Sequence, residues 1–267
     1  MKRRAIFLIA GWAHTERALH PVASALQEAA YDVRVESTWR LLNRLGNVPW
    51  QGPSQGESSV RKKNSGLSYY AKGLRQILEK QGAPCIVVGW SAGGMVAMEV
   101  AVEHPELLER LVLIGATARL CADNGYPCGV AAGNVRAMIL DMKKNPMAVL
   151  DRFFQDVSWP AVESEWLRNK KVKAAHNMGI EPLVDGLRYL QKTDLRDKLK
   201  GVKIPALIIH GRDDRIVPWQ AGQWLNDSLP DSRIIIHEGV GHDIDGRQSA
   251  VLASEIIEFM EDNNLTV

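Results

Sequence analysis

The chain has 267 residues, of which 46% are hydrophobic, and a formal net charge of +2 at pH 7. This length and composition suit a single catalytic domain that buries a full core and still carries an insertion. The nearly balanced charge does not call for nucleic acid as a partner, and no stretch approaches the ~20 apolar residues of a membrane span.

A basic cluster, Lys2-Arg3-Arg4, precedes the apolar run at residues 5–10. This order is similar to that of a secretory signal, but the apolar run is short and no A-x-A cleavage site follows it. We therefore expect a first buried strand at Ala5–Ile9.

The cysteines predict free thiols. Cys85, Cys121 and Cys128 are too few and too unevenly spaced for a disulfide framework, and no pair has zinc-finger spacing. A reducing cytoplasm is the simplest setting, and no His, Glu or Cys cluster has a spacing that calls for a metal or cofactor.

Short apolar runs alternate with helical patterns along the chain, which indicates a mostly parallel sheet with helices on both faces. The predicted strands are Ala5–Ile9, Val33–Glu36, Cys85–Val88, Leu111–Ile114, Ala206–Ile209 and Arg233–His237. The predicted helices are Ala18–Ala30, Tyr69–Lys80, Met95–Glu103, Gln220–Leu229 and Ser249–Asp262. The polar stretch Gly46–Ser68 predicts a long loop.

The alternation stops between Ile114 and Ile204, where apolar residues follow helical spacing. A helical insertion in an open sheet is placed to cover the carboxyl ends of the strands, where ligands bind. We therefore predict a core of residues 1–116 and 201–267 and a helical lid of residues 117–200. The apolar groups behind the helical prediction are Val135/Met138/Ile139/Met142, Val149/Leu150/Phe153/Phe154, Trp159/Val162/Trp166 and Leu183/Leu187/Leu190.

A candidate nucleophile follows the third predicted strand. Residues 87–93 read V-V-G-W-S-A-G, and a helical pattern begins soon after them. A G-x-S-x-G sequence between a strand and a helix presents its serine, here Ser91, on a sharp turn. A serine hydroxyl is a weak nucleophile, so it needs a base within hydrogen-bond reach and a carboxylate that orients the base.

Both partners follow later strands. Residues 210–218 read H-G-R-D-D-R-I-V-P and residues 239–243 read G-V-G-H-D. We predict Asp214 as the acid, in preference to Asp213, because it is the fourth residue of G-x-x-D with Val-Pro following. We predict His242 as the base, since the other histidines fit the order Ser, acid, His less well: His14, His20, His104, His176, His210 and His237.

An oxyanion on the substrate would need donors fixed in advance. We expect one from the backbone N–H of Ala92, which follows the nucleophile, and a second from the backbone N–H of Trp12, in the loop after the first strand. The alternative is that Trp12 serves only as an aromatic residue of the core or of a pocket wall.

With these residues in place, the chain resembles the α/β-hydrolases, and within them the pimeloyl-acyl-carrier-protein methyl ester esterases of biotin synthesis. The narrower likeness rests on Gly11-Trp12, on Gly89-Trp90-Ser91-x-Gly93-Gly94, and on the segments 186–190 (G-L-R-Y-L) and 193–196 (T-D-L-R). It covers nearly the whole chain and implies an α/β-hydrolase fold and a serine carboxylesterase. No cofactor is implied.

Two positions depart from that family's pattern. Ala10-Gly11 stands where His-Gly is usual, and the D-x-P-G-x-G-x-S stretch has only a distant counterpart at residues 52–58. Neither set performs the chemistry, so these departures concern the substrate and not the hydrolase assignment.

The predicted lid supplies candidate substrate contacts. Its methionines and aromatic residues either line an acyl channel or pack the lid against the core. With Trp90, which precedes the nucleophile, the candidate substrate-binding residues are Met138, Met142, Phe153 and Phe154.

The predicted lid is also basic. Residues 130–200 carry thirteen Lys/Arg and nine Asp/Glu. This excess suits an acidic partner such as an acyl carrier protein, although solvated helical faces commonly carry Lys and Arg. The candidate docking residues are Arg136, Lys143, Lys144, Arg152, Lys170 and Lys171.

Three other functions remain open at this point. A general short-chain carboxylesterase would share every catalytic residue. Carbon–carbon bond hydrolysis, or acyl transfer to an acceptor other than water, would reuse the same three side chains. A non-catalytic receptor or scaffold on a hydrolase fold would tolerate the loss of triad members, whereas Ser91, Asp214 and His242 are all present.

Overall fold

The computed structural model describes residues 4–44, 66–243 and 248–262. Its centre is a six-stranded sheet in the order β2-β1-β3-β4-β5-β6, and every neighbouring pair is parallel. The strands are β1 (Ala5–Ala10), β2 (Asp32–Ser37), β3 (Cys85–Trp90), β4 (Leu108–Ile114), β5 (Ala206–Gly211) and β6 (Ser232–His237). The predicted parallel sheet is thus confirmed, with each predicted strand inside an observed one.

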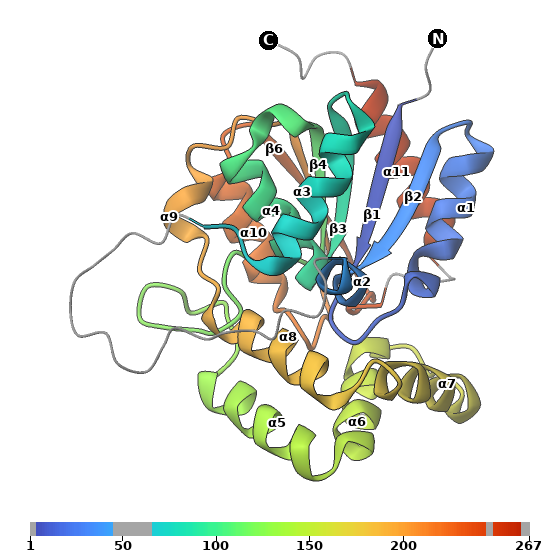
Figure 1. Cartoon of the computed structure of the whole chain (residues 1–267), viewed down its shortest axis with the longest axis vertical. Coiled ribbons are helices and arrows are strands. Elements are labelled where there is room, and N and C mark those ends of the chain that lie inside the picture. Colours follow the sequence, from blue (N-terminus) through green and yellow to red (C-terminus); the bar gives the residue numbers. More distant parts are fainter. Residues whose placement is uncertain (1–3, 45–65, 244–247, 263–267) are drawn as a thin grey trace.

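Helices cover both faces of the sheet (Figure 1). One face carries α1 (His20–Glu28) and α11 (Ser249–Glu261), and the other carries α3 (Tyr69–Gln81), α4 (Ala92–Glu103) and α10 (Trp219–Ser228). Shorter elements complete the core: η1 (Glu16–Leu19), α2 (Thr38–Asn43), η2 (Pro105–Leu107) and α9 (Arg196–Leu199).

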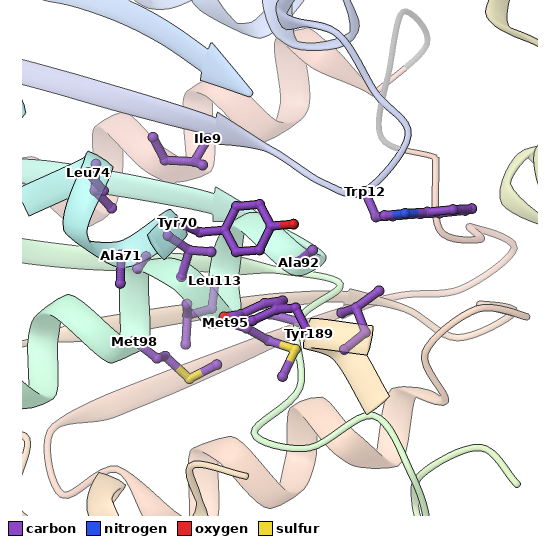
Figure 2. Packing of buried hydrophobic residues seen from close by; sticks show 14 of the residues in the cluster. Ile9, Trp12, Tyr70, Ala71, Leu74, Ala92, Met95, Met98, Leu113 and Tyr189 are labelled. Carbon is purple, nitrogen blue, oxygen red and sulfur yellow. The ribbon is translucent and has the colours of Figure 1, made fainter. Parts of the chain in front are cut away.

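Alternating side chains along the strands pack into two hydrophobic cores, one on each face of the sheet. In β1, Ile6 and Leu8 pack toward α1 and α11, whereas Phe7 and Ile9 pack toward α3 and α4. This two-residue alternation is what a strand buried on both faces requires. Figure 2 shows the second core, where Ile9 and Leu113 of the sheet lie near residues of α3, α4 and α8.

Between β4 and β5 the chain forms a helical insertion, defined here as α5 (Ala132–Lys144), α6 (Pro146–Ser158), α7 (Glu165–His176) and α8 (Ile180–Lys192). Figure 1 shows these helices together beyond the carboxyl ends of the strands. The insertion is anchored to the core by α8, because Tyr189 donates to the buried carboxylate of Glu99 on α4 at 2.6 Å.

The segment between β4 and β5 departs from the sequence prediction at two places. Residues 117–131 form no helix and instead make isolated bridges, such as Cys121 with Val130. Trp159 and Val162, predicted as helical, lie in the turn between α6 and α7, because Pro160 lacks the N–H that a helix needs and disfavours the helical conformation at Trp159.

Three other sequence-based expectations concern loops, thiols and membrane spans. Most of the predicted loop Gly46–Ser68, with its residues 52–58, lies outside the described residues. The three cysteines are free thiols. In the ranges that the structure describes, the helices are too short or too polar to cross a membrane.

The close packing of α4 against β1 gives a test of the fold. A Cβ at Gly93 would lie 2.2 Å from the backbone oxygen of Ile9, and backbone cannot move aside cheaply. We expect Gly93→Ala to lower the free energy of unfolding by about 1–3 kcal/mol, the usual cost of overpacking. Urea denaturation measures this change.

The matched control is Gly133→Ala at the start of α5, where a Cβ would meet nothing within 4 Å. Because alanine stabilises a helix more than glycine does, the free energy of unfolding of this variant should be unchanged or slightly raised. Equal losses from the two substitutions would contradict the packing described here.

Candidate functional site

Ser91 lies on the sharp turn between β3 and α4. Its φ of 56° and ψ of −122° are unusual for a residue with a side chain, and such conformations persist only where the surroundings hold them. Its backbone N–H donates to Ile114 of β4 at 2.8 Å, and its carbonyl accepts from Gly94 at 2.9 Å. The half-buried side chain therefore stands at the carboxyl edge of the sheet, at the start of a helix.

Asp214 is a fully buried carboxylate in the loop after β5. Its Oδ2 lies 2.6 Å from Nδ1 of His242, and its Oδ1 accepts from the backbone N–H groups of Ile216 and Val217, both at 2.8 Å. The neighbouring Asp213 is exposed. The buried, fully bonded carboxylate is thus the one predicted from the G-x-x-D spacing.

The electrostatics keep Asp214 charged. Burial opposes its ionisation, but the charge of His242 and the hydrogen bonds from His210 and His242 outweigh burial and hold the pKa of Asp214 well below its ordinary value. The carboxylate is therefore available to orient and stabilise an imidazolium at His242.

His242 is held from both ends. Its ring bonds to Asp214, and its backbone oxygen accepts from Nε1 of Trp90 at 3.0 Å. Trp90 is the last residue of β3, is 1% exposed and directly precedes Ser91. One tryptophan thus ties the loop that carries His242 to the turn that carries Ser91.

Gly115, directly after β4, contacts His242 and Asp214 and follows the residue that binds Ser91. It follows Ile114, the backbone partner of Ser91, and has a φ of 51°. A Cβ at Gly115 would lie 3.2 Å from Nδ1 of His242 and 3.5 Å from Oδ2 of Asp214. The backbone at residue 115 therefore packs directly on the imidazole–carboxylate pair and adjoins the serine turn.

The predicted oxyanion donors lie on both sides of Ser91. Ala92 is the first residue of α4, so its N–H belongs to the positive end of a helix. Gly11, beside Trp12, packs on the serine: a Cβ there would lie 2.9 Å from the Cβ of Ser91. The indole of Trp12 is buried and donates to the backbone oxygen of Leu183 on α8 at 2.8 Å.

The predicted substrate contacts divide by their burial. Met142, Phe154 and Trp90 are buried, whereas Met138 and Phe153 are half-buried. The ring of Phe153 stands edge-on to Trp12, with centroids 4.7 Å apart. Of these side chains, Phe153 is the one that both retains exposed surface and contacts the residue predicted to donate to the oxyanion.

Four of the predicted docking residues are accessible to a partner. Arg136, Lys143, Lys144 and Arg152 are exposed on α5 and α6.

The neighbouring lysines of α7 differ from each other. Lys170 is exposed and stacks on the ring of Trp166, whereas Nζ of Lys171 lies 2.8 Å from both Glu163 and Asp243 and is 16% exposed. Lys171 is therefore part of the contact between the insertion and the loop of His242, and it is poorly placed to receive a partner.

Sequence reasoning missed His210. It fits the order Ser, acid, His less well than His242, yet its Nε2 lies 3.3 Å from Oδ2 of Asp214 and 2.9 Å from the oxygen of Val217. Its spacing of four residues before the acid was the available signal. Among the described residues, no group of three His, Cys, Asp or Glu side chains is arranged to hold a metal ion.

Comparisons with known proteins agree with this architecture. The family model described as serine aminopeptidase, S33 (Hydrolase_4) matches residues 52–246. A protein of Aromatoleum aromaticum named pimeloyl-[acyl-carrier protein] methyl ester esterase is 35% identical over 59% of this chain and 66% of that protein. One of the same name from Aeromonas hydrophila is 28% identical over 89% of this chain and 87% of that protein.

The chain thus spans slightly less than two thirds of the first of these relatives. Among solved structures, the esterase EaEST from Exiguobacterium antarcticum superposes with a TM-score of 0.80 at 18% identity, covering 97% of this chain and 92% of that one. These likenesses confirm both the fold and the resemblance inferred from the sequence.

The ion pairs of Lys171 generate a prediction about stability. Lys171→Met would leave Glu163 and Asp243, both largely buried, without the cation between them. Removing one partner of a buried pair costs about 3 kcal/mol, so the free energy of unfolding should fall by that order. The control, Lys170→Met, removes an exposed cation–π contact and should cost about 0.5 kcal/mol. Equal losses in urea denaturation would show that Lys171 does not anchor this contact.

Proposed function

Because the chain belongs to the Hydrolase_4 family and has the α/β-hydrolase fold, we propose that it is a serine carboxylesterase that works through an acyl-enzyme. The observation that carries this proposal is the buried Asp214–His242 pair, 2.6 Å apart, which Trp90 joins to the strained turn of Ser91. Each group has the chemistry that its role needs.

In the first half-reaction, Oγ of Ser91 attacks the ester carbonyl while Nε2 of His242 takes the hydroxyl proton. The carbonyl oxygen gains negative charge, which the backbone N–H groups of Ala92 and Trp12 stabilise. When the intermediate collapses, His242 returns the proton to the departing alcohol, leaving an acyl group on Ser91. Asp214 stays ionised throughout and holds the imidazole.

In the second half-reaction, His242 takes a proton from water as the water attacks the acyl-enzyme. Collapse of this intermediate returns the proton to Oγ of Ser91 and releases the carboxylic acid. Ser91, His242, the departing alcohol and the attacking water account for every proton that moves in the two half-reactions.

We propose that residues 117–200 act as a lid domain over the core formed by residues 1–116 and 201–267. The placement of α5–α8 beyond the carboxyl ends of the strands supports this division (Figure 1). Phe153 supports it too, since it reaches from α6 to Trp12. The acyl chain of the substrate would then contact mainly the half-buried Phe153 and Met138. Met142, Phe154 and Trp90 are buried and would support them.

The proposed substrate is the methyl ester of pimeloyl-acyl-carrier protein, and the proposed setting is the cytoplasm. The names of two relatives support the substrate, and the free cysteines suit a reducing compartment. The exposed basic side chains on α5 and α6 supply a surface for an acidic carrier. They are Arg136, Lys143, Lys144 and Arg152.

The serine mechanism predicts the outcome of one substitution. Ser91→Ala should lower turnover of a short p-nitrophenyl ester by about 10⁶-fold, as for triad nucleophiles in other serine hydrolases. The release of p-nitrophenol measures it, with circular dichroism to show that the variant is folded. A folded variant that keeps most of its activity would rule out the mechanism, and a wild-type chain with no hydrolase activity would favour a receptor or scaffold.

The carrier-protein surface has its own test. Replacing the four exposed cations with glutamine should raise KM for methyl pimeloyl-carrier protein at least tenfold and leave KM for the p-nitrophenyl ester unchanged, because only the carrier needs the basic surface. The four positions are Arg136, Lys143, Lys144 and Arg152. A wild-type protein that hydrolyses the small ester but not the carrier-linked one would instead indicate a general carboxylesterase.

A further inference from the structure

His210 is a buried imidazole that contacts the proposed acid. It is the penultimate residue of β5, four residues before Asp214, and its side chain is 0% exposed. Its Nε2 lies 2.9 Å from the backbone oxygen of Val217 and 3.3 Å from Oδ2 of Asp214. The mechanism above makes no use of it.

The surroundings determine which nitrogen carries the hydrogen. A backbone oxygen and an ionised carboxylate only accept hydrogen bonds, so Nε2 of His210 must be the donor. Nδ1 is buried and has no partner among the described residues. The backbone of α10 packs on that edge, since a Cβ at Gly222 would lie 2.6 Å from Nδ1. A hydrogen on Nδ1 would therefore have no acceptor.

This donor completes the environment of the carboxylate. Oδ1 of Asp214 accepts from two backbone N–H groups, and Oδ2 receives both His242 and His210. Three hydrogen bonds and the close contact from Nε2 of His210 restrict the rotation of the carboxylate. Oδ2 is thereby aimed at Nδ1 of His242.

We propose that His210 is a positioning residue that acts on His242 through Asp214. The single N–H of His210 links Asp214 to the oxygen of Val217, whose own N–H binds Oδ1 of the same carboxylate. The imidazole thus holds the loop of residues 212–218 around the carboxylate. This inference rests on the proposed roles of Asp214 and His242 in ester hydrolysis.

A purely structural role would give different behaviour. If His210 served only to satisfy the buried oxygen of Val217, its loss would lower stability and leave the His242–Asp214 hydrogen bond unchanged. If it positions the carboxylate, its loss must also disturb that hydrogen bond. The test therefore needs a readout at His242 as well as turnover.

The experiment compares His210→Gln with His210→Asn in the full chain. Glutamine places an amide N–H near the position of Nε2, whereas asparagine is too short to reach Asp214. We expect H210N to lower kcat on a p-nitrophenyl ester by about 10-fold to 100-fold, the range known for residues that orient metal-binding side chains through a hydrogen bond. KM should stay unchanged, and H210Q should recover most of kcat.

The second readout is the far-downfield proton NMR signal of the His242–Asp214 hydrogen bond. It should shift or disappear in H210N and persist in H210Q. His237→Gln is the matched control, since His237 on β6 pairs with Glu255 and does not contact Asp214. It should leave both kcat and the signal unchanged.

A folded H210N that keeps wild-type kcat and the downfield signal would overturn the proposal. If asparagine prevents folding, His210→Leu fills the space, removes the donor and is judged by the same two readouts. The NMR signal needs no substrate. It therefore tests the positioning role even where the wild-type chain fails to hydrolyse an ester, which would count against the proposed function alone.

Discussion

A buried negative charge organises this site. Removing a carboxylate from water is costly unless hydrogen bonds replace its hydration, and the side chain of Asp214 is completely buried. The groups that contact this carboxylate come from β5, from the loop of residues 212–218 and from the loop after β6. Satisfying one charge thus brings together segments that are far apart in the sequence.

The second constraint is the tight turn at Ser91. Its left-handed backbone is held by β4 through Ile114 and by the close approach of the chain at Gly11. Trp90 then connects this turn to the backbone of His242, and Gly115 packs against the imidazole. The serine turn and the imidazole–carboxylate pair are therefore connected by direct contacts at the carboxyl edge of the sheet.

Much of this arrangement was predictable from local patterns. The apolar runs predicted all six strands, and the spacing of G-x-x-D with Val-Pro favoured Asp214 over the exposed Asp213. The same reasoning missed His210 and did not predict the ion pairs of Lys171, because a buried imidazole and a solvated one, or a paired lysine and a solvated one, look alike in a sequence. The direction of Trp90 was unpredictable for a related reason, since its partner lies 152 residues away.

The most direct test of the account is covalent labelling of the wild-type chain with a fluorophosphonate, followed by mass spectrometry of the peptide that carries the adduct. We expect one adduct per chain, on Ser91, and complete loss of ester hydrolysis once labelling is complete. An adduct on another residue, or full esterase activity after Ser91 is labelled, would contradict the assignment of Ser91 as the nucleophile.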